Sequence, residues 1–336
     1  MVKVAIIGFG GIANGAHYPA YKKLEAEGVA KVVAVCDVDE NRFGGSVAIN
    51  IGSSDDSLER DFTPYTDWRV MLQNEDVDMV DICVPSFLHA DVACGVLEMG
   101  YDVLSEKPMA LDYETCLKML ETQKKSGKQL MIGQCLRFGA NYNFLKKAID
   151  ENLFGKVKAG IFRRFSGPPL WGWNGWFMDG RKSGGALQDL HIHDVDIVRY
   201  LLGDPQAVSC TTADIYAGND IVYSQLHYED ATILAIGDWS REGCDFQADF
   251  TMSFEKATVT LKDNQIVVCP RGGEKYVADI EANNFYEEEI RFFINLIQNG
   301  EKNTANPPES AAVTVKLTET LRESARKGGE KVPFIV

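Results

Sequence analysis

The sequence predicts an α/β fold in two domains: a doubly wound N-terminal domain, then an α+β domain with a large, open, mixed or antiparallel sheet. The length of 336 residues exceeds what a single hydrophobic core usually supports. Residues 1–133 alternate short apolar runs with helical stretches, which is typical of a parallel sheet covered on both faces. Residues 206–270 alternate β-branched or aromatic residues with polar ones, which indicates a sheet open on one side. We therefore divide the chain into residues 1–133 and 134–336.

The elements of the first domain follow from its periodicity. Short apolar runs predict strands at residues 2–7, 31–36, 79–84, 102–104 and 129–133. The stretches between them predict helices at residues 18–27, 68–73, 89–99 and 113–126. Crossovers between parallel strands are right-handed, so the helices are expected on both faces of one sheet.

The second domain has a different pattern. We expect a helix at 142–152, strands within 156–165, a loop rich in glycine and tryptophan at 167–185, and helices at 188–202, 285–299 and 308–327. Turn residues divide the 206–270 region at 217–219, 229–230 and 263–264. A sheet of this kind leaves one face needing cover, so we expect a homodimer or homotetramer formed through the C-terminal sheet.

Composition limits the class of protein. The formal net charge of −15 argues against nucleic acid as a partner, because such binding needs a basic surface. No long apolar run or basic patch indicates a membrane partner. The eight cysteines are scattered without CxxC pairs, which favours reduced, buried thiols over disulfides or zinc. The expected location is the cytoplasm.

A glycine motif follows the first predicted strand. Gly8-Phe9-Gly10-Gly11-Ile12-Ala13 matches G-x-G-x-x-A and precedes a predicted helix, the setting in which Rossmann domains bind dinucleotides. We expect the backbone at Gly8, Gly10, Gly11 and Ile12 to contact the cofactor pyrophosphate. Asp37 ends the second strand, where a carboxylate binds the ribose hydroxyls and repels a 2′-phosphate. NAD is therefore expected over NADP, although Arg42 stands close enough in sequence to reach a phosphate.

Residues 183–196 combine a glycine pair with histidines and carboxylates. On a helix, Asp189, His193 and Asp196 fall at i, i+4 and i+7 and form an acid–imidazole–acid column on one face. A neutral imidazole held by a carboxylate accepts a proton near neutral pH. Alone, Asp189 and His193 are more often an exposed surface pair. Asp194 is expected to face solvent or to act as a cap partner.

Other residues near this column have open roles. His191 and His193 would converge on a metal if they lay on a strand, but on a helix i and i+2 point apart, so no metal is expected. Trp176 precedes the column in a glycine-broken loop and forms either a packing cluster or a substrate-pocket wall. His17 has no partner close in sequence and is expected to be structural or exposed.

Two further motifs complete a recognisable order. Val84-Pro85-Ser86-Phe87-Leu88-His89 follows the third strand, and Ser105-Glu106-Lys107-Pro108 follows the fourth. With the glycine loop and residues 183–196, the chain resembles the glucose–fructose oxidoreductase/inositol dehydrogenase (Gfo/Idh/MocA) family over its full length. That resemblance implies a Rossmann domain, an α+β domain and NAD(P)-dependent oxidoreductase chemistry.

The resemblance also implies roles for single residues. Lys107 matches the family lysine between nicotinamide and substrate, and Asp189 with His193 matches the D-x-x-x-H pair that completes the catalytic set. Pro85, His89 and Glu106 match positions at the cofactor. Arg137 matches an arginine near the domain junction. We expect four residues at the substrate: Arg137, Trp176, His191 and Asp196. The family often has a small residue where this chain has His191. Asp196 has two open roles, binding substrate hydroxyls or bracing the histidine.

The residues give a physical reason for these roles. An ammonium at the end of a parallel strand, as at Lys107, can stabilise alkoxide charge, and His193 can take the hydroxyl proton. The expected function is hydride transfer between NAD and a secondary alcohol of a sugar, inositol or similar cyclic polyol. Alternatives are an NAD-retaining enzyme that cleaves or isomerises glycosides, and a non-catalytic NAD-sensing regulator.

Overall fold

The computed structural model describes residues 1–44, 48–49, 52–53 and 58–336. The chain divides into two compact units. Unit 1 comprises Met1–Cys135, Pro169–Ser183 and Tyr286–Ala312. Unit 2 comprises Leu136–Pro168, Gly184–Phe285 and Val313–Val336. The predicted domain boundary at 133/134 lies close to the first break between the units, but two later segments return to unit 1.

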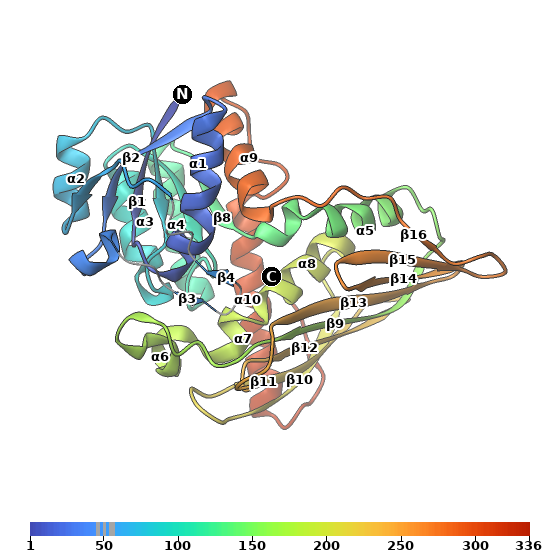
Figure 1. Ribbon diagram of the computed structural model, residues 1–336. Helices are drawn as coiled ribbons and strands as arrows, with labels where there is room; N and C mark the ends of the chain where they lie inside the picture. Colours follow the sequence, from blue (N-terminus) through green and yellow to red (C-terminus); the bar gives the residue numbers. More distant parts are fainter. Residues whose placement is uncertain (45–47, 50–51, 54–57) are drawn as a thin grey trace. The chain divides into compact units, whose positions relative to one another are not determined.

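Unit 1 is built on a parallel sheet with the strand order β5-β2-β1-β6-β7-β8, which is the order of a doubly wound domain (Figure 1). Its strands are β1 (Val2–Ile7), β2 (Ala30–Cys36), β5 (Thr63–Tyr65), β6 (Met79–Ile82), β7 (Asp102–Glu106) and β8 (Leu130–Gly133). A separate short pair is β3 (Ala48–Ile49) and β4 (Gly52–Ser53). The helical segments before residue 136 are η1 (Ala13–His17), α1 (Tyr18–Ala26), η2 (Glu40–Phe43), α2 (Trp68–Asn74), η3 (Ser86–Leu88), α3 (His89–Glu98) and α4 (Tyr113–Ser126).

The strands of unit 1 form where apolar residues run almost without interruption. Every residue of β6, β7 and β8 is buried, as expected for a sheet covered on both faces. The predicted strands and helices of this region are therefore confirmed within a few residues. One difference matters for the site: β7 extends to Glu106, so Lys107 follows the strand directly.

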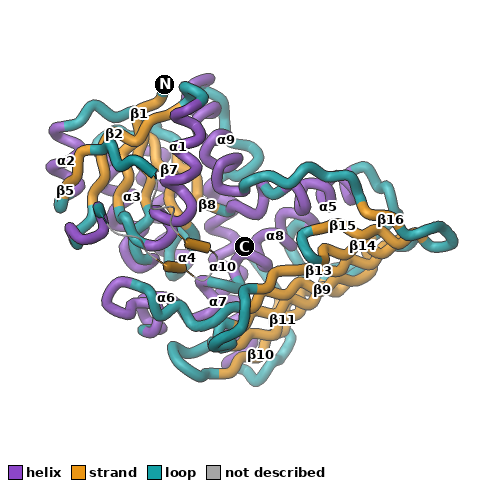
Figure 2. The backbone as a smooth tube through the Cα atoms, viewed as in Figure 1, coloured by secondary structure: helices purple, strands orange, loops and turns teal. Residues whose placement is uncertain are grey.

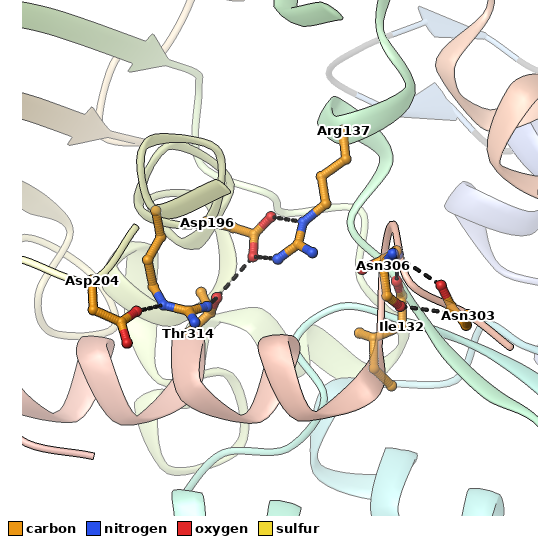
Figure 3. A network of polar contacts seen from close by, with 8 residues as sticks. Ile132, Arg137, Asp196, Asp204, Asn303, Asn306 and Thr314 are labelled. Atoms are coloured by element: carbon orange, nitrogen blue, oxygen red, sulfur yellow. Dashed lines mark hydrogen bonds and ion pairs between the residues drawn. The ribbon is translucent and has the colours of Figure 1, made fainter. Parts of the chain in front are cut away.

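Two distant segments complete unit 1. Residues 169–183 were expected to form a loop but contain η5 (Trp173–Met178) and α6 (Gly180–Ser183). The helix α9 (Phe285–Asn299) lies beside α1, and Arg291 pairs with Glu27 between them (Figure 1). The Asn306 side chain donates to the Ile132 carbonyl at 2.8 Å, which joins this segment to β8 (Figure 3).

Unit 2 is built on a mixed sheet with the order β16-β15-β14-β13-β9-β12-β11-β10-β17 (Figure 2). β9 pairs in parallel with β12, and the other neighbours are antiparallel, so the predicted mixed sheet is confirmed. The strands are β9 (Val157–Phe165), β10 (Ala207–Ala213), β11 (Ile221–His227), β12 (Thr232–Asp238), β13 (Gln247–Phe254), β14 (Ala257–Lys262), β15 (Gln265–Pro270), β16 (Tyr276–Val277) and β17 (Val332–Pro333). The remaining helical segments are η4 (Cys135–Phe138), α5 (Ala140–Asp150), α7 (Gly185–Asp189), α8 (Ile192–Leu202) and α10 (Pro308–Arg326).

The two faces of this sheet differ. On the face toward α5, Phe250 of β13 contacts Tyr142 with ring centroids 5.6 Å apart. The opposite face carries Ile161, Leu234, Ile236 and Tyr223 in register across β9, β12 and β11. These four side chains are half-buried or exposed, so the expectation of a partly apolar open face agrees with the register.

No helix among the described residues is long and apolar enough to cross a membrane. All eight cysteines are free thiols. Cys244 and Cys269 are exposed, so the expectation of buried thiols was wrong for these two, which lie in a turn and at a strand end.

Candidate active site

The glycine loop after β1 requires glycine at position 8 for conformational and steric reasons, whereas position 10 has open space around its Cα. Gly8 has a φ of +88°, and a Cβ there would lie 2.7 Å from the backbone carbon of Cys83. A Cβ at Gly10 would meet no described atom within 4 Å. The chain then enters a helix at Gly11 and Ile12, whose first-turn N–H groups have no partner within the helix itself. Such a loop fits a pyrophosphate.

Asp37 lies beside this loop at the end of β2. Its Oδ2 accepts from the Phe9 N–H at 2.7 Å, and its Oδ1 accepts from the Asp39 N–H at 2.9 Å. These bonds fix a carboxylate where ribose hydroxyls bind in Rossmann domains. Arg42 lies in η2 with its Nε 3.6 Å from Asp39, so its charge already faces a carboxylate.

Asn14 was missed at the sequence level. It is buried, and its amide donates to the Phe9 carbonyl at 2.6 Å and to the Gly10 carbonyl at 3.3 Å. The side chain braces the glycine loop from the following helix. The available signal was an asparagine directly after the glycine motif, where its amide can hydrogen-bond the loop backbone.

His89 joins the two family-like motifs of unit 1. Its Nδ1 lies 2.7 Å from the Pro108 carbonyl oxygen, and its Nε2 lies 2.8 Å from the Val84 carbonyl oxygen. The ring is buried. His89 therefore holds the segment containing Pro85 against the segment containing Lys107.

Lys107 and Glu106 lie at the end of β7 with different surroundings. The Lys107 side chain is half-buried. The Glu106 carboxylate is buried, with Oε2 accepting from the Lys107 N–H at 2.9 Å and Oε1 lying 2.9 Å from His17 Nε2. Glu106 thus faces the interior of unit 1.

Four neighbouring strands therefore carry the candidate residues at one edge. Gly8 follows β1, Asp37 follows β2, Pro85 lies shortly after β6 and Lys107 follows β7. The strands are parallel, so these positions share the carboxyl edge of the sheet. Ligands bind at this edge in doubly wound sheets.

In unit 2, the predicted helix at 188–202 is interrupted. α7 ends at Asp189 and α8 begins at Ile192, and the His191 N–H reaches back to the Ala186 carbonyl at 2.7 Å. This i→i−5 bond inserts an extra residue into the turn, which sequence periodicity does not reveal. Asp189 and His193 are half-buried.

Asp196, predicted as the last residue of the acid–imidazole–acid column, lies on α8 together with His193. Its carboxylate is buried and accepts from Arg137, with Nε to Oδ2 at 2.8 Å and Nη2 to Oδ1 at 2.6 Å (Figure 3). Thr314 also donates to Oδ1 at 2.8 Å, and Arg199 donates to Thr314 at 3.0 Å (Figure 3). These contacts tie Asp196 to Arg137 and Thr314 inside unit 2, and its two open roles, binding substrate hydroxyls or bracing the histidine, stay predictions.

His191 is fully buried in unit 2. Its Nε2 lies 2.8 Å from the Ser224 hydroxyl, and its ring packs where Gly237 has no Cβ. Burial, aided by the positive charge of Arg164, lowers the pKa of His191 to about 3, so the ring is neutral. Asp194, expected near solvent, is also buried and binds Arg164 at 2.8 Å, because this arginine of β9 is itself buried and needs an anion.

Trp176 belongs to unit 1. Only 9% of it is exposed, and its ring stacks on Phe177 with centroids 3.8 Å apart. It also meets Phe87 edge-on at 6.4 Å. These contacts favour the packing cluster over the pocket wall, and they place residues 169–183 against the motif between Pro85 and His89.

Comparison with known proteins agrees with this geometry. A family described as "Oxidoreductase family, NAD-binding Rossmann fold" matches residues 2–134, and the "GFO/IDH/MocA C-terminal domain" matches residues 142–274. The chain belongs to the Gfo/Idh/MocA family. NAD is therefore the cofactor of the Rossmann domain, and the resemblance seen in the sequence is confirmed.

Individual Gfo/Idh/MocA relatives are distant. A 2,7-anhydro-N-acetylneuraminate hydratase from Mediterraneibacter gnavus is 32% identical over 192 residues, which span 57% of this chain and 48% of the relative. The alignment thus spans about half of that protein. A myo-inositol 2-dehydrogenase from Thermotoga maritima is 24% identical, covering 98% of this chain and 97% of the relative.

The fold is shared along the whole chain. The solved structure described as levoglucosan dehydrogenase in complex with NADH and levoglucosan matches with a TM-score of 0.84 and 18% identity, covering 100% of both chains. This similarity confirms the predicted fold class of a Rossmann domain followed by an α+β domain with an open sheet.

Proposed function

We propose that this Gfo/Idh/MocA protein is an NAD-dependent dehydrogenase that oxidises a secondary alcohol of a sugar, inositol or similar cyclic polyol. The observation that carries the proposal is the shared carboxyl edge of unit 1, which holds Gly8, Asp37, Pro85 and Lys107 on neighbouring strands. A nucleotide site and a reactive cation at one edge are what hydride transfer at a bound nicotinamide requires.

The chain supplies the proton chemistry and the electrostatics. The Lys107 ammonium hydrogen-bonds the reacting oxygen and stabilises negative charge that develops on it. His193 takes the hydroxyl proton, and Asp189 orients its ring. When bound, NAD supplies the hydride acceptor. Both Asp189 and His193 are half-buried, which leaves them accessible for this role.

The proposed cofactor contacts follow the same edge. The backbone at Gly8, Gly10, Gly11 and Ile12 binds the pyrophosphate, and Asp37 binds the adenosine ribose. Pro85 lines the nicotinamide side, with His89 holding its segment in place. NAD is preferred over NADP because the Asp37 carboxylate repels a 2′-phosphate and Arg42 is engaged with Asp39.

The substrate class rests on the relatives. Their names include a myo-inositol dehydrogenase and a levoglucosan dehydrogenase, both of which act on ring-borne hydroxyl groups. We infer that Arg137, Asp196 and His191 act from inside unit 2, shaping the helix that carries His193 rather than contacting substrate. Trp176 packs on Phe87 and Phe177 and acts within unit 1, by supporting the motif that follows β6.

The direct test is a panel of cyclitols, sugars and anhydrosugars with NAD and, separately, with NADP. We expect a steady increase in NADH absorbance with at least one ring polyol, and a higher kcat/KM with NAD than with NADP. A panel that gives neither NADH nor any converted product would reject the proposal.

A second candidate function is supported by the hydratase relative. Hydration of a substrate involves no net oxidation, so an NAD-binding enzyme of this kind releases no net NADH. In that case the protein retains NAD and oxidises its glycoside only transiently. The same panel separates the two, since product formed without net NADH identifies the retaining enzyme.

A further inference from the structure

A buried histidine that the proposed mechanism does not use lies in the interior of unit 1. His17 is on η1, shortly after the glycine loop, and it has no exposed surface. Its Nδ1 lies 2.7 Å from Asp81 Oδ2 on β6, and its Nε2 lies 2.9 Å from Glu106 Oε1 on β7. One imidazole therefore bridges carboxylates from two adjacent strands.

The geometry favours a doubly protonated ring. A neutral imidazole has one N–H donor, whereas both ring nitrogens of His17 face carboxylate oxygens at hydrogen-bond distance. A doubly protonated ring satisfies both contacts and places one positive charge between two negative ones. Burial lowers the pKa of His17, but its interactions with Asp81 and Cys83 together outweigh burial, so the pKa of His17 is well above 6.5.

The other groups around the ring do not supply a competing cation. Tyr286 of α9 packs on the ring at 5.5 Å, and burial raises the pKa of Cys83 to about 12, so that thiol is neutral. Tyr21 borders the same cluster through Asp81, and the carboxylate of Glu289 acts on both Tyr21 and Tyr286. The ligand atoms of His17, Asp81 and Cys83 lie within 4.8 Å of one another. However, the direct 2.7 Å contact between His17 and Asp81 fills the space that a metal ion would need.

We propose that His17 is a positioning residue for Lys107. As an imidazolium held by Asp81, it fixes one oxygen of Glu106, and the other oxygen of Glu106 holds the Lys107 N–H at 2.9 Å. The chain of contacts begins in the helix that follows the glycine loop and ends at the backbone of the reactive lysine. These contacts link the segment after the glycine loop to the backbone from which the Lys107 side chain extends.

This inference rests on the proposed role of Lys107, but its physical core is tested without activity. The ring nitrogens are followed by NMR in the natural protein with ¹⁵N-labelled histidine. The signals that are lost in the spectrum of His17→Gln are those of His17. We expect both His17 ring nitrogens to stay protonated from pH 6 to pH 8, while His191 stays neutral. A singly protonated His17 ring at pH 7 overturns the inference. If His17→Gln does not fold, single substitutions of the other four histidines assign their signals and leave those of His17 by elimination.

The link to Lys107 is tested by amide exchange. Glutamine at position 17 is neutral and carries both N–H donors on one nitrogen, so it cannot replace donors on the two separate nitrogens of a charged ring, and Glu106 loses its fixed partner. We expect the Lys107 amide, followed in a peptide covering residues 104–110, to exchange at least about tenfold faster in His17→Gln. His227→Gln is the matched control, since this half-buried histidine contacts Ser209 in unit 2. Unchanged exchange at Lys107 in folded His17→Gln overturns the proposal.

The kinetic test asks whether His17 acts through Glu106. We expect His17→Gln to lower kcat at least about tenfold, with the Kd for NAD and the substrate KM changed less than about threefold. In a Glu106→Gln background the same substitution should change kcat less than about twofold, because neighbouring residues that act through each other are not additive. Equal losses in both backgrounds would refute the pathway. If no substrate gives product, the proposed function fails, and the nitrogen and exchange data still decide this inference.

Discussion

Lys107 stands at the point where a fully buried strand reaches the carboxyl edge of the sheet. Its backbone N–H is fixed by Glu106, while its side chain is only half-buried. The backbone contact fixes the point from which the side chain extends, and partial exposure leaves the ammonium accessible at this edge of the sheet. That is the main residue-scale requirement for electrostatic stabilisation.

Removing the two reactive groups should stop turnover without emptying the nucleotide site. We expect Lys107→Met and His193→Ala each to lower kcat by about 10²-fold or more, the usual effect of deleting an electrostatic or proton-transfer group. NAD affinity, measured by calorimetry, should change little. Lys118→Met is the control, since this exposed lysine pairs with Glu114 on its own helix, far along the chain from Lys107's strand end. Turnover that survives either substitution would contradict the assigned role.

His191 makes a pH-dependent contribution to stability with a defined sign. Its pKa is about 3 in the fold and about 6.5 when unfolded. Between these values the unfolded chain binds the extra proton, so stability falls as the pH is lowered from 6.5 towards 3. The slope approaches about 1.4 kcal/mol per pH unit.

The comparison with His191→Gln isolates this contribution. We expect urea midpoints measured from pH 7 to pH 4 to fall more steeply for the natural protein than for the variant. All other titrating groups are shared by the two proteins. Parallel curves would show that His191 is not buried as a neutral ring.

At the scale of single residues, the sequence predicts those functional residues that are marked by a motif of adjacent residues. Lys107 was found because Glu106 and Pro108 flank it, and Gly8 because a strand precedes it. His17 was missed because its partners, Asp81 and Glu106, are far away in sequence. Asp81 was nevertheless visible as a carboxylate inside a buried apolar run, a placement that requires a partner.

Among the elements, the turn from β1 into η1 has the strictest requirement. Gly8→Ala adds a Cβ 2.7 Å from the backbone of Cys83 at a φ of +88°, so both the conformation and the contact are unfavourable. Gly28→Ala has a similar φ of +75° but meets no described atom within 4 Å. Comparing the two substitutions thus separates the cost of the left-handed backbone conformation from the cost of a steric clash.

We expect Gly28→Ala to cost about 1–2 kcal/mol, the left-handed penalty alone. Gly8→Ala should lower the Tm further and weaken NAD binding at least about tenfold, because the loop must move. Thermal unfolding and calorimetry with NAD check both values. Equal effects on Tm, with unchanged NAD affinity, would argue against the collision.

Helices and strands with a clear hydrophobic periodicity were predicted closely. Elements that depend on tertiary contacts were not. α4 matches its predicted range of 113–126, since its period and its N-cap Asp112 are local features. β5 was missed because Thr63–Tyr65 contains a proline and few apolar residues, and only its pairing with β2 makes it a strand. The break between α7 and α8 depends on the burial of His191 and Asp194, which no local pattern contains.

For the whole molecule, the open face of the unit 2 sheet bears on assembly. Ile161 is 43% exposed and Tyr223 is 50% exposed, on a face where Leu234 and Ile236 lie between them. Apolar side chains gathered on a flat sheet surface favour association with a second copy.

We expect light scattering to show a homodimer or homotetramer, and Ile161→Glu with Tyr223→Glu to shift it towards monomer. Ile215→Glu is the control, since Ile215 is 54% exposed but lies in the loop between β10 and β11. A monomeric natural protein would reject the expected assembly.

Unit 1 draws on three separate stretches of the chain, and this has a consequence for its synthesis. The α9 segment and residues 169–183 cover it, yet α9 leaves the ribosome long after Cys135. At about 5–20 residues per second, the nucleotide-binding unit waits unfinished for roughly ten seconds or more while the rest is made. During that interval its surface for α9 is uncovered, so a nascent chain halted before residue 312 is a natural client for chaperones.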